Sequence, residues 1–316
     1  MTTTAHVPSP YGDALARIPV RTGSIEVLGS STRYWEYGDT TAASTLVLVL
    51  VHGFRGDHHG LEPVVAQLPG IRIIAPDLPG FGESAPLRDA RHDLDGYARW
   101  LRAFVAALDP SGPLVVLGHS FGSIVVAATL ADERAPDALR PAAVVLVNPI
   151  AAPALEGPRG LFTRLAVFYY WLASALPARL GFALLRNRLI VRVMSVAMAK
   201  TRDRALRRWI HDQHDRFFSA FGDRSVVLEA FRASVSHDVS DYAPSITRPT
   251  LLIAAADDDI TPLSAQHVLV TLFPQATLHV IDGVGHLIHY ETPVAAASAM
   301  RDFFAAHGVT TAESAS

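Results

Sequence analysis

The chain contains no cysteine among its 316 residues. This absence excludes disulfide bonds, zinc–thiolate centres and a cysteine nucleophile. Its 14 histidines show no metal-ligand spacing of the H-E-x-x-H kind. No phosphate-binding loop or dinucleotide fingerprint is present either. We therefore expect no metal and no cofactor.

Lysine is almost absent, since Lys200 is the only lysine among 27 basic residues. The formal net charge is −3, and no recognised nucleic-acid-binding motif occurs. The basic residues are interleaved with apolar ones, whereas a nucleic acid requires a clustered basic surface. We expect no nucleic-acid partner.

Long hydrophobic runs are also missing. The first twenty residues lack the apolar core of a secretory signal. The uncharged segment 165–178 has 14 residues, whereas a helix that crosses a bilayer needs about 20. These absences predict a cytoplasmic protein that, if it meets a membrane, lies on the membrane surface.

What the chain does contain is typical of a globular α/β protein, since 50% of its residues are hydrophobic and 18% are charged. An opening antiparallel pair is expected at 24–28 and 32–37. Short apolar runs follow at 45–51, 71–76, 114–118, 143–147, 250–255 and 277–281. They are separated by helical patterns at 60–68, 92–108 and 121–132. Such alternation predicts a mostly parallel sheet with helices on both faces.

The alternation stops after residue 149 and resumes near residue 250. Residues 151–240 contain 14 basic and 7 acidic residues, a net charge of +7, whereas the rest of the chain has a net charge of −10. Eleven of the 26 aromatic residues also fall in this segment. Its helical spacing and basic character are compatible with ordinary core packing, with an anionic or carboxylate-bearing substrate, or with transient contact at a membrane surface.

Residues 118–122, of sequence G-H-S-F-G, carry the strongest chemical signal. They lie between the apolar run that ends at residue 117 and a helical pattern, which is typical of a nucleophile elbow. Glycines two positions either side of the serine permit a sharp turn from strand into helix. The turn exposes the Ser120 hydroxyl at a helix N-terminus, where backbone N–H groups can stabilise an oxyanion.

An acid and a base follow Ser120 in the order that such a site requires. Residues 257–259 are three aspartates directly after the apolar run 250–255, and His286 follows the run 277–281. Ser120, Asp258 and His286 therefore form a candidate nucleophile–acid–base set.

Four blocks together resemble the α/β-hydrolase superfamily, in its serine-nucleophile, cap-bearing, esterase- and lipase-like branch. They are V-H-G-F at 51–54, D-L-P-G-F-G-E-S at 77–84, the segment 118–122, and the Asp258/His286 pair. The resemblance covers roughly residues 24–307, apart from a variable middle. It implies an α/β-hydrolase fold with a helical cap inserted after the sixth strand. The implied domains are 1–149 (first part of the core), 150–240 (cap) and 241–316 (second part of the core, with a frayed C-terminal tail); we also expect the first dozen residues to be frayed.

The resemblance also implies roles for single residues. Ser120 matches the nucleophile and His286 the base, while Asp258 matches the acid because it precedes Pro262 in a D-x-x-x-P pattern. The oxyanion hole of the family corresponds to the N–H groups of Phe54 and Phe121.

Several neighbours compete for these roles. Asp257 and Asp259 are interpreted as solvated loop carboxylates or helix caps, and His289 as a less suitable base than His286. His52 is interpreted as structural, beside the oxyanion loop. His58 and His59 are expected near the site entrance, as surface loop residues or as substrate contacts.

The function that these residues predict is hydrolysis of a carboxylic ester or thioester with an apolar acyl group. The same triad also serves carbon–carbon bond hydrolysis of ring-cleavage products, amide cleavage, acyl transfer and perhydrolysis, and fold and triad do not separate these reactions. A ligand-binding protein without turnover and a membrane-surface lipase are the alternatives of other classes.

Overall fold

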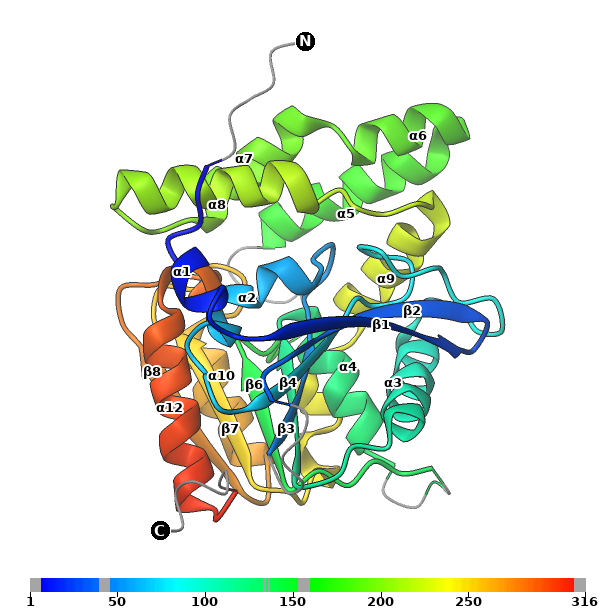
Figure 1. The fold of residues 1–316 in the computed structure, drawn as a ribbon. Coiled ribbons are helices and arrows are strands. Elements are labelled where there is room, and N and C mark those ends of the chain that lie inside the picture. The colour runs from blue at the N-terminus through cyan, green and yellow to red at the C-terminus, as the bar shows by residue number, and fades with distance from the viewer. Residues whose placement is uncertain (1–6, 40–45, 133–134, 136, 153–159, 310–316) are drawn as a thin grey trace.

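The computed structural model describes residues 7–39, 46–132, 135, 137–152 and 160–309. Its centre is an eight-stranded sheet with the order β1-β2-β4-β3-β5-β6-β7-β8 (Figure 1). The strands are β1 Val20–Val27, β2 Ser30–Tyr37, β3 Val47–Val51, β4 Arg72–Pro76, β5 Leu114–His119, β6 Ala143–Val147, β7 Thr250–Ala255 and β8 Ala276–Ile281. β2 runs antiparallel to β1 and β4, and all other neighbours are parallel. The predicted α/β-hydrolase architecture is confirmed.

Each strand predicted from an apolar run is present; β6 and β7 have the predicted bounds, and the ends of the others are shifted. β1 begins at Val20, four residues before the predicted start, because the segment from Val20 to Gly23 pairs with residues 34–37 of β2. This extension contains exposed and polar residues, so hydrophobicity alone did not indicate it.

Side chains of alternate residues in β3 point to opposite faces of the sheet, as strand geometry requires. Val47, Val49 and Val51 join one apolar core, and Leu48 and Leu50 join another. The first core includes residues of α3 Leu94–Leu108, α4 Phe121–Leu130 and α10 Leu263–Leu272. The second includes residues of α2 Glu62–Val65 and α12 Pro293–Ala306. Helices therefore cover both faces, as the apolar runs predicted.

Between β6 and β7 the described residues form five α-helices, here called the inserted helices. They are α5 Gly160–Ala175, α6 Ala178–Leu185, α7 Arg188–Met198, α8 Arg204–Phe217 and α9 Arg224–Ser236. The α7, α8 and α9 helices begin after Asn187, Asp203 and Asp223, whose side chains accept hydrogen bonds from backbone N–H groups of the first turn. In Figure 1, α5–α8 form a layer at one end of the molecule, above the sheet. That they act as a separate cap domain stays a prediction.

The N-terminal segment is better packed than we expected. Tyr11 precedes α1 Gly12–Leu15 and donates a hydrogen bond from its hydroxyl to the Tyr290 carbonyl at 2.6 Å. Its ring also packs edge-on against Trp209 of α8, at a centroid distance of 5.5 Å. The expectation that the first dozen residues fray is therefore wrong for residues 7–12. Residues 1–6, and residues 310–316 of the tail 308–316 that was predicted to fray, lie outside the described residues.

The helices of the described residues are all too short or too polar to cross a lipid bilayer. A further short α-helix, α11 Ile288–Glu291, follows β8 and carries His289.

Candidate active site

The nucleophile elbow lies between β5 and α4. Ser120 has a φ of +53°, a conformation that L-residues rarely adopt, and its N–H donates to the Val147 carbonyl at 3.0 Å. A Cβ added at Gly122 would lie 2.2 Å from the Val51 carbonyl oxygen. A Cβ added at Gly118 would lie 2.4 Å from the Gly122 carbonyl oxygen. Both flanking glycines are therefore required by close backbone approach, as the motif predicted.

Two hydrogen bonds connect the three predicted residues in one line. His286 Nε2 lies 2.8 Å from Ser120 Oγ, and His286 Nδ1 lies 2.8 Å from Asp258 Oδ2. Ser120 follows β5, Asp258 follows β7 and His286 follows β8. These three strands are parallel, so their carboxyl ends meet at one edge of the sheet. With Nδ1–H donating to the carboxylate, the imidazole Nε2 is an acceptor for the serine proton.

Asp258 is held by three further hydrogen bonds. Its Oδ1 accepts from the backbone N–H groups of Ile260 (2.7 Å) and Thr261 (3.1 Å). Its Oδ2 accepts from the Thr261 hydroxyl at 2.6 Å. Burial by itself raises the pKa of Asp258, but the adjacent His286 and the hydrogen bonds from His286 and Thr261 outweigh it and lower the pKa to about 2. The carboxylate is thus ionised and fixed in orientation.

Thr261 was missed by our sequence analysis. The sequence feature that could have indicated Thr261 is its position three residues after Asp258. An aspartate commonly accepts hydrogen bonds from backbone N–H groups two and three residues later. The hydroxyl at that third position adds the bond to the oxygen that also faces His286.

The structure distinguishes Asp258 from its two neighbours. Asp258 is buried, whereas Asp257 and Asp259 are exposed. Asp259 forms an ion pair with Lys200 at 2.5 Å. Only the middle carboxylate of the three faces the imidazole of His286.

Phe54 and Phe121 lie beside Ser120. Phe121 is the first residue of α4, so its N–H has no intrahelical partner. Phe54 follows Gly53, where an added Cβ would lie 3.3 Å from Ser120 Cβ. The two phenylalanine rings meet edge-on at a centroid distance of 6.3 Å. Both candidate oxyanion donors therefore belong to residues in contact around the serine.

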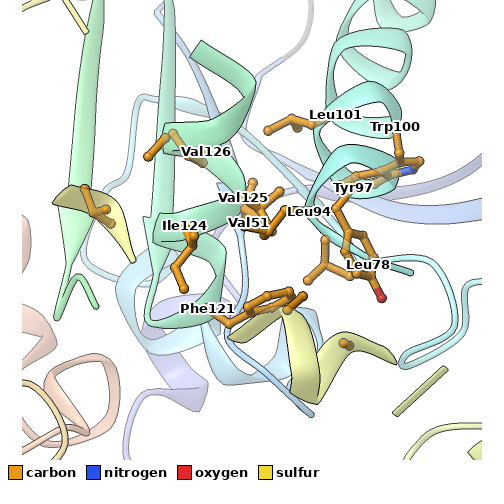
Figure 2. Close-up of a cluster of buried hydrophobic side chains, with 14 of the residues drawn as sticks. Val51, Leu78, Leu94, Tyr97, Trp100, Leu101, Phe121, Ile124, Val125 and Val126 are labelled. Carbon is orange, nitrogen blue, oxygen red and sulfur yellow. The ribbon is translucent and has the colours of Figure 1, made fainter. Parts of the chain in front are cut away.

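The surroundings of these two rings are aromatic. Phe54 packs near Tyr170 of α5 at 5.8 Å and Phe231 of α9 at 6.1 Å between ring centroids. Phe121 packs against Tyr97 of α3 at 5.7 Å, and Figure 2 shows its ring beside Leu78 and Tyr97. Core and inserted helices thus contribute side chains to one apolar environment next to Ser120.

Other histidines surround the site without facing the serine hydroxyl. His52 Nε2 accepts from the Leu78 N–H at 2.8 Å, and His52 Nδ1 donates to the Gly53 carbonyl at 2.8 Å. This agrees with the structural role expected of His52. His289 is buried against His119, at a ring-centroid distance of 4.1 Å, and burial lowers its pKa well below the ordinary value.

The expectation that His58 and His59 are surface loop residues is wrong for His58. It is buried, donates from Nδ1 to Asp77 Oδ1 at 2.9 Å and stacks on Trp35. His59 is half-buried and stacks on Phe217 of α8. The residues that flank His58 and His59 in the sequence did not indicate this burial. Both rings pack against elements distant in sequence, as the contacts with Trp35 and Phe217 show.

One group of the described residues has the spacing of metal ligands. Asp57, His58 and His59 each place a ligand atom within 4.8 Å of the others. Protein contacts already account for much of this arrangement, because His58 Nδ1 bonds Asp77 and Asp57 Oδ1 accepts from the His59 N–H. The group is separate from the Ser120–His286–Asp258 line.

Arg55 is a second residue that sequence analysis missed. It follows Phe54, has a φ of +61° and is 1% exposed. Its guanidinium donates to the carbonyl oxygens of Leu185 (2.7 Å) and Phe218 (3.1 Å). It also donates to the Tyr170 hydroxyl at 3.2 Å. A single buried cation thus ties the loop after β3 to the inserted helices.

The sequence matches the alpha/beta hydrolase fold family over residues 47–293. The chain belongs to this family. This α/β hydrolase is similar to a non-heme chloroperoxidase of Burkholderia pyrrocinia. The two are 29% identical over 256 residues, which cover 79% of this chain and 88% of that protein. The chain is 26% identical to a 2-hydroxy-6-oxononadienedioate/2-hydroxy-6-oxononatrienedioate hydrolase of Cupriavidus pinatubonensis over 290 residues, 84% of this chain and 89% of the relative.

Solved structures agree on the fold of this α/β hydrolase. A thermophilic esterase from Thermogutta terrifontis superposes with a TM-score of 0.69 at 23% identity, covering 91% of this chain and 99% of the esterase. The relatives and structural neighbours are enzymes, chiefly hydrolases, which confirms the predicted enzyme class. They differ in reaction.

Proposed function

We propose that this α/β hydrolase cleaves a carboxylic ester or thioester with an apolar acyl group through an acyl-enzyme on Ser120. The observation that carries the proposal is the hydrogen-bonded line from Ser120 Oγ through His286 to Asp258, with 2.8 Å at each step. A serine, an imidazole and a buried carboxylate in this order are the parts of nucleophilic acyl transfer.

In the first half-reaction Ser120 Oγ attacks the acyl carbonyl carbon while His286 Nε2 accepts the hydroxyl proton. Asp258 stabilises the imidazolium and keeps Nδ1 protonated. The N–H groups of Phe54 and Phe121 stabilise the tetrahedral oxyanion, an interaction worth about 3 kcal/mol per donor in comparable sites. The intermediate then expels the alcohol or thiol, which takes the proton from His286.

In the second half-reaction water attacks the acyl-enzyme, with His286 now accepting a proton from the water. Collapse of the second intermediate breaks the bond between the acyl carbon and Ser120 Oγ, and the serine regains its proton. The products are the free acid and the unmodified enzyme.

The apolar character of the acyl group follows from the rings around Ser120. Phe54 is only partly buried and contacts the buried rings of Phe121, Tyr170 and Phe231, so an acyl chain beside Phe54 would lie in aromatic surroundings. In this proposal the inserted helices act as a cap that excludes water and selects the acyl chain.

Hydrolysis of p-nitrophenyl esters from acetate to palmitate tests the proposal, with folded Ser120→Ala as the matched control. We expect turnover that depends on Ser120, and a preference for acyl chains longer than acetate. Turnover that is unchanged in Ser120→Ala, or no turnover of any ester by folded protein, would overturn it.

Carbon–carbon bond hydrolysis is the second candidate, favoured by the similarity to the 2-hydroxy-6-oxononadienedioate/2-hydroxy-6-oxononatrienedioate hydrolase. The same Ser120, His286 and Asp258 would serve it. Turnover of a vinylogous 1,5-diketone together with inactivity on the ester series would favour this reaction over ester cleavage.

A further inference from the structure

Two of the inserted helices carry stripes of exposed apolar side chains. On α5 these are Leu165, Phe168 and Trp171, and on α7 they are Leu189, Val193 and Val196. All six are more than half exposed, with values from 54% to 72%. We call these six residues the α5/α7 surface.

Helical spacing separates this surface from the residues that pack inside the protein. Leu189, Val193 and Val196 lie at i, i+4 and i+7, so they share one face of α7. Val191 and Ser195, on the other side of the helix, are buried. On α5, Tyr170 and Ala173 are buried, whereas Phe168 and Trp171 stack on each other in solvent. The packing of α5 and α7 is thus complete without the exposed stripes.

The charge of the same segment has one sign. Residues 160–202 contain seven basic residues and no acidic one. Arg164, Arg179, Arg186 and Arg188 are exposed, and none of them forms an ion pair with a carboxylate of the described residues. The nearby Arg192 differs, because it pairs with Asp215 of α8.

This combination selects among possible partners. A second copy placed symmetrically on the α5/α7 surface would bring like arginines together, because an isologous interface repeats the same patch on both subunits. An anionic lipid surface instead attracts arginines, and its interfacial region accepts tryptophan and aliphatic side chains. The parts of the chain outside residues 151–240 carry a net charge of −10. An anionic bilayer therefore repels them and orients the molecule with the α5/α7 surface toward the lipid.

We propose that the α5/α7 surface docks on the face of an anionic phospholipid bilayer. Trp171, Phe168 and the α7 stripe enter the interfacial region, and the four exposed arginines bind lipid phosphates. The helices lie on the bilayer and do not cross it. The opposite side of α5 carries Tyr170, whose ring faces Phe54, so docking brings the aromatic surroundings of Ser120 close to the lipid. The proposal concerns binding alone and does not rest on the proposed ester hydrolysis.

Sedimentation of the full chain with vesicles tests this proposal. We expect binding to vesicles of phosphatidylcholine mixed with phosphatidylglycerol, and at least about tenfold weaker binding to phosphatidylcholine alone. Raising the salt concentration from ~0.05 M to ~0.5 M should weaken binding, because it shortens the screening length. Tryptophan emission should shift to the blue with anionic vesicles, and Trp171→Phe should abolish most of that shift.

Matched variants locate the surface. Val193→Glu on α7 and Val268→Glu on α10 replace residues that are both 62% exposed, yet only Val193→Glu should weaken vesicle binding, by about tenfold. Arg188→Glu should weaken it by at least about fivefold, whereas Arg99→Glu on α3 should leave it unchanged. Circular dichroism checks that each variant is folded.

Three results would overturn the proposal. One is equal binding, or no binding, to anionic and zwitterionic vesicles. Another is vesicle binding that persists in Val193→Glu combined with Arg188→Glu. The third is a concentration-dependent dimer in sedimentation velocity that Val193→Glu dissociates, without vesicle binding by the wild type, which would identify the surface as a contact between two copies of the chain.

Discussion

Nη2 of Arg55 donates a hydrogen bond to the carbonyl oxygen of Leu185 at 2.7 Å. Leu185 is the last residue of α6 and lies 130 positions along the chain. Because Arg55 adjoins Phe54, this bond and those to Phe218 and Tyr170 connect the proposed oxyanion loop to the inserted helices. The side chain is buried, so its contacts are made without competition from water.

Replacing Arg55 with Met should lower the free energy of unfolding by about 3 kcal/mol, because two buried carbonyl acceptors lose their donor. Ester turnover should fall as well, since the loop that carries Phe54 loses its anchor. Arg55→Lys should not restore stability, because one ammonium group cannot reach acceptors spread around a planar guanidinium.

Guanidinium-chloride unfolding checks this prediction, with Arg192→Met as the control. Arg192 pairs with Asp215 at the surface of the inserted helices, and its loss should cost less than about 1 kcal/mol. Equal stability of Arg55→Met and Arg192→Met would contradict the anchoring role.

Asp258→Asn should reduce kcat by about 10⁴-fold, because an amide stabilises the wrong imidazole tautomer and leaves the imidazolium uncompensated. Asp257→Asn and Asp259→Asn should change kcat by no more than about twofold, as is usual for exposed side chains. Steady-state kinetics on the best ester compares the three variants. A larger loss at position 257 or 259 would move the triad acid to that residue.

Thr261→Val should lower kcat by about tenfold at nearly constant KM, because a hydrogen bond to a charged group is worth about 1.5 kcal/mol. Thr261 is a positioning residue, since its hydroxyl acts on Asp258 Oδ2 and not on the substrate. Thr261→Ser keeps the hydroxyl and should restore most of the activity. If Ser and Val at this position were equally active, the hydroxyl would have no part in orienting the carboxylate.

The protein should lose stability as pH falls below about 6.5. Burial, followed by the nearby His211, lowers the pKa of His214 to about 3. Burial, followed by the nearby His286, lowers the pKa of His119 to about 3. Between the unfolded value of 6.5 and about 3, the unfolded chain binds more protons than the folded one, so protonation favours unfolding. Each such histidine contributes a slope of up to about 1.4 kcal/mol per pH unit.

His214→Asn isolates one of these contributions. The amide oxygen can replace His214 Nδ1 in the 2.7 Å hydrogen bond with Ser195 Oγ, but the amide does not titrate. The free energy of unfolding, measured by urea titration at several pH values, should therefore fall less steeply in this variant, by up to about 1.4 kcal/mol per pH unit. An unchanged slope would show that His214 is not held neutral in the folded protein.

Local sequence was sufficient for most of the sheet and for the elbow at Ser120. Short apolar runs placed β3, β6 and β7 because these strands are buried on both faces and need no alternation to be recognised, whereas burial alternates along the edge strand β8. Gly118 and Gly122 were predictable for a related reason, since the steric limits of a strand–turn–helix junction act between residues adjacent in the chain. The antiparallel extension at Val20 was not predictable, because residues 20–22 are exposed, two of them are polar, and the segment is held by its pairing with β2.

The sequence by itself determined the order Ser120, Asp258, His286 and the elbow that exposes the serine. Its D-x-x-x-P spacing already favoured Asp258 over its two neighbours, but only the tertiary structure buried that carboxylate, packed His58 against Trp35 and brought Arg55 to Leu185. The physical reason is the range of the interactions. Backbone sterics and strand burial act over a few neighbouring residues, whereas burial of a charge and its hydrogen-bond partners depend on separate segments that folding brings together, 28 positions apart for Asp258 and His286 and 130 for Arg55 and Leu185.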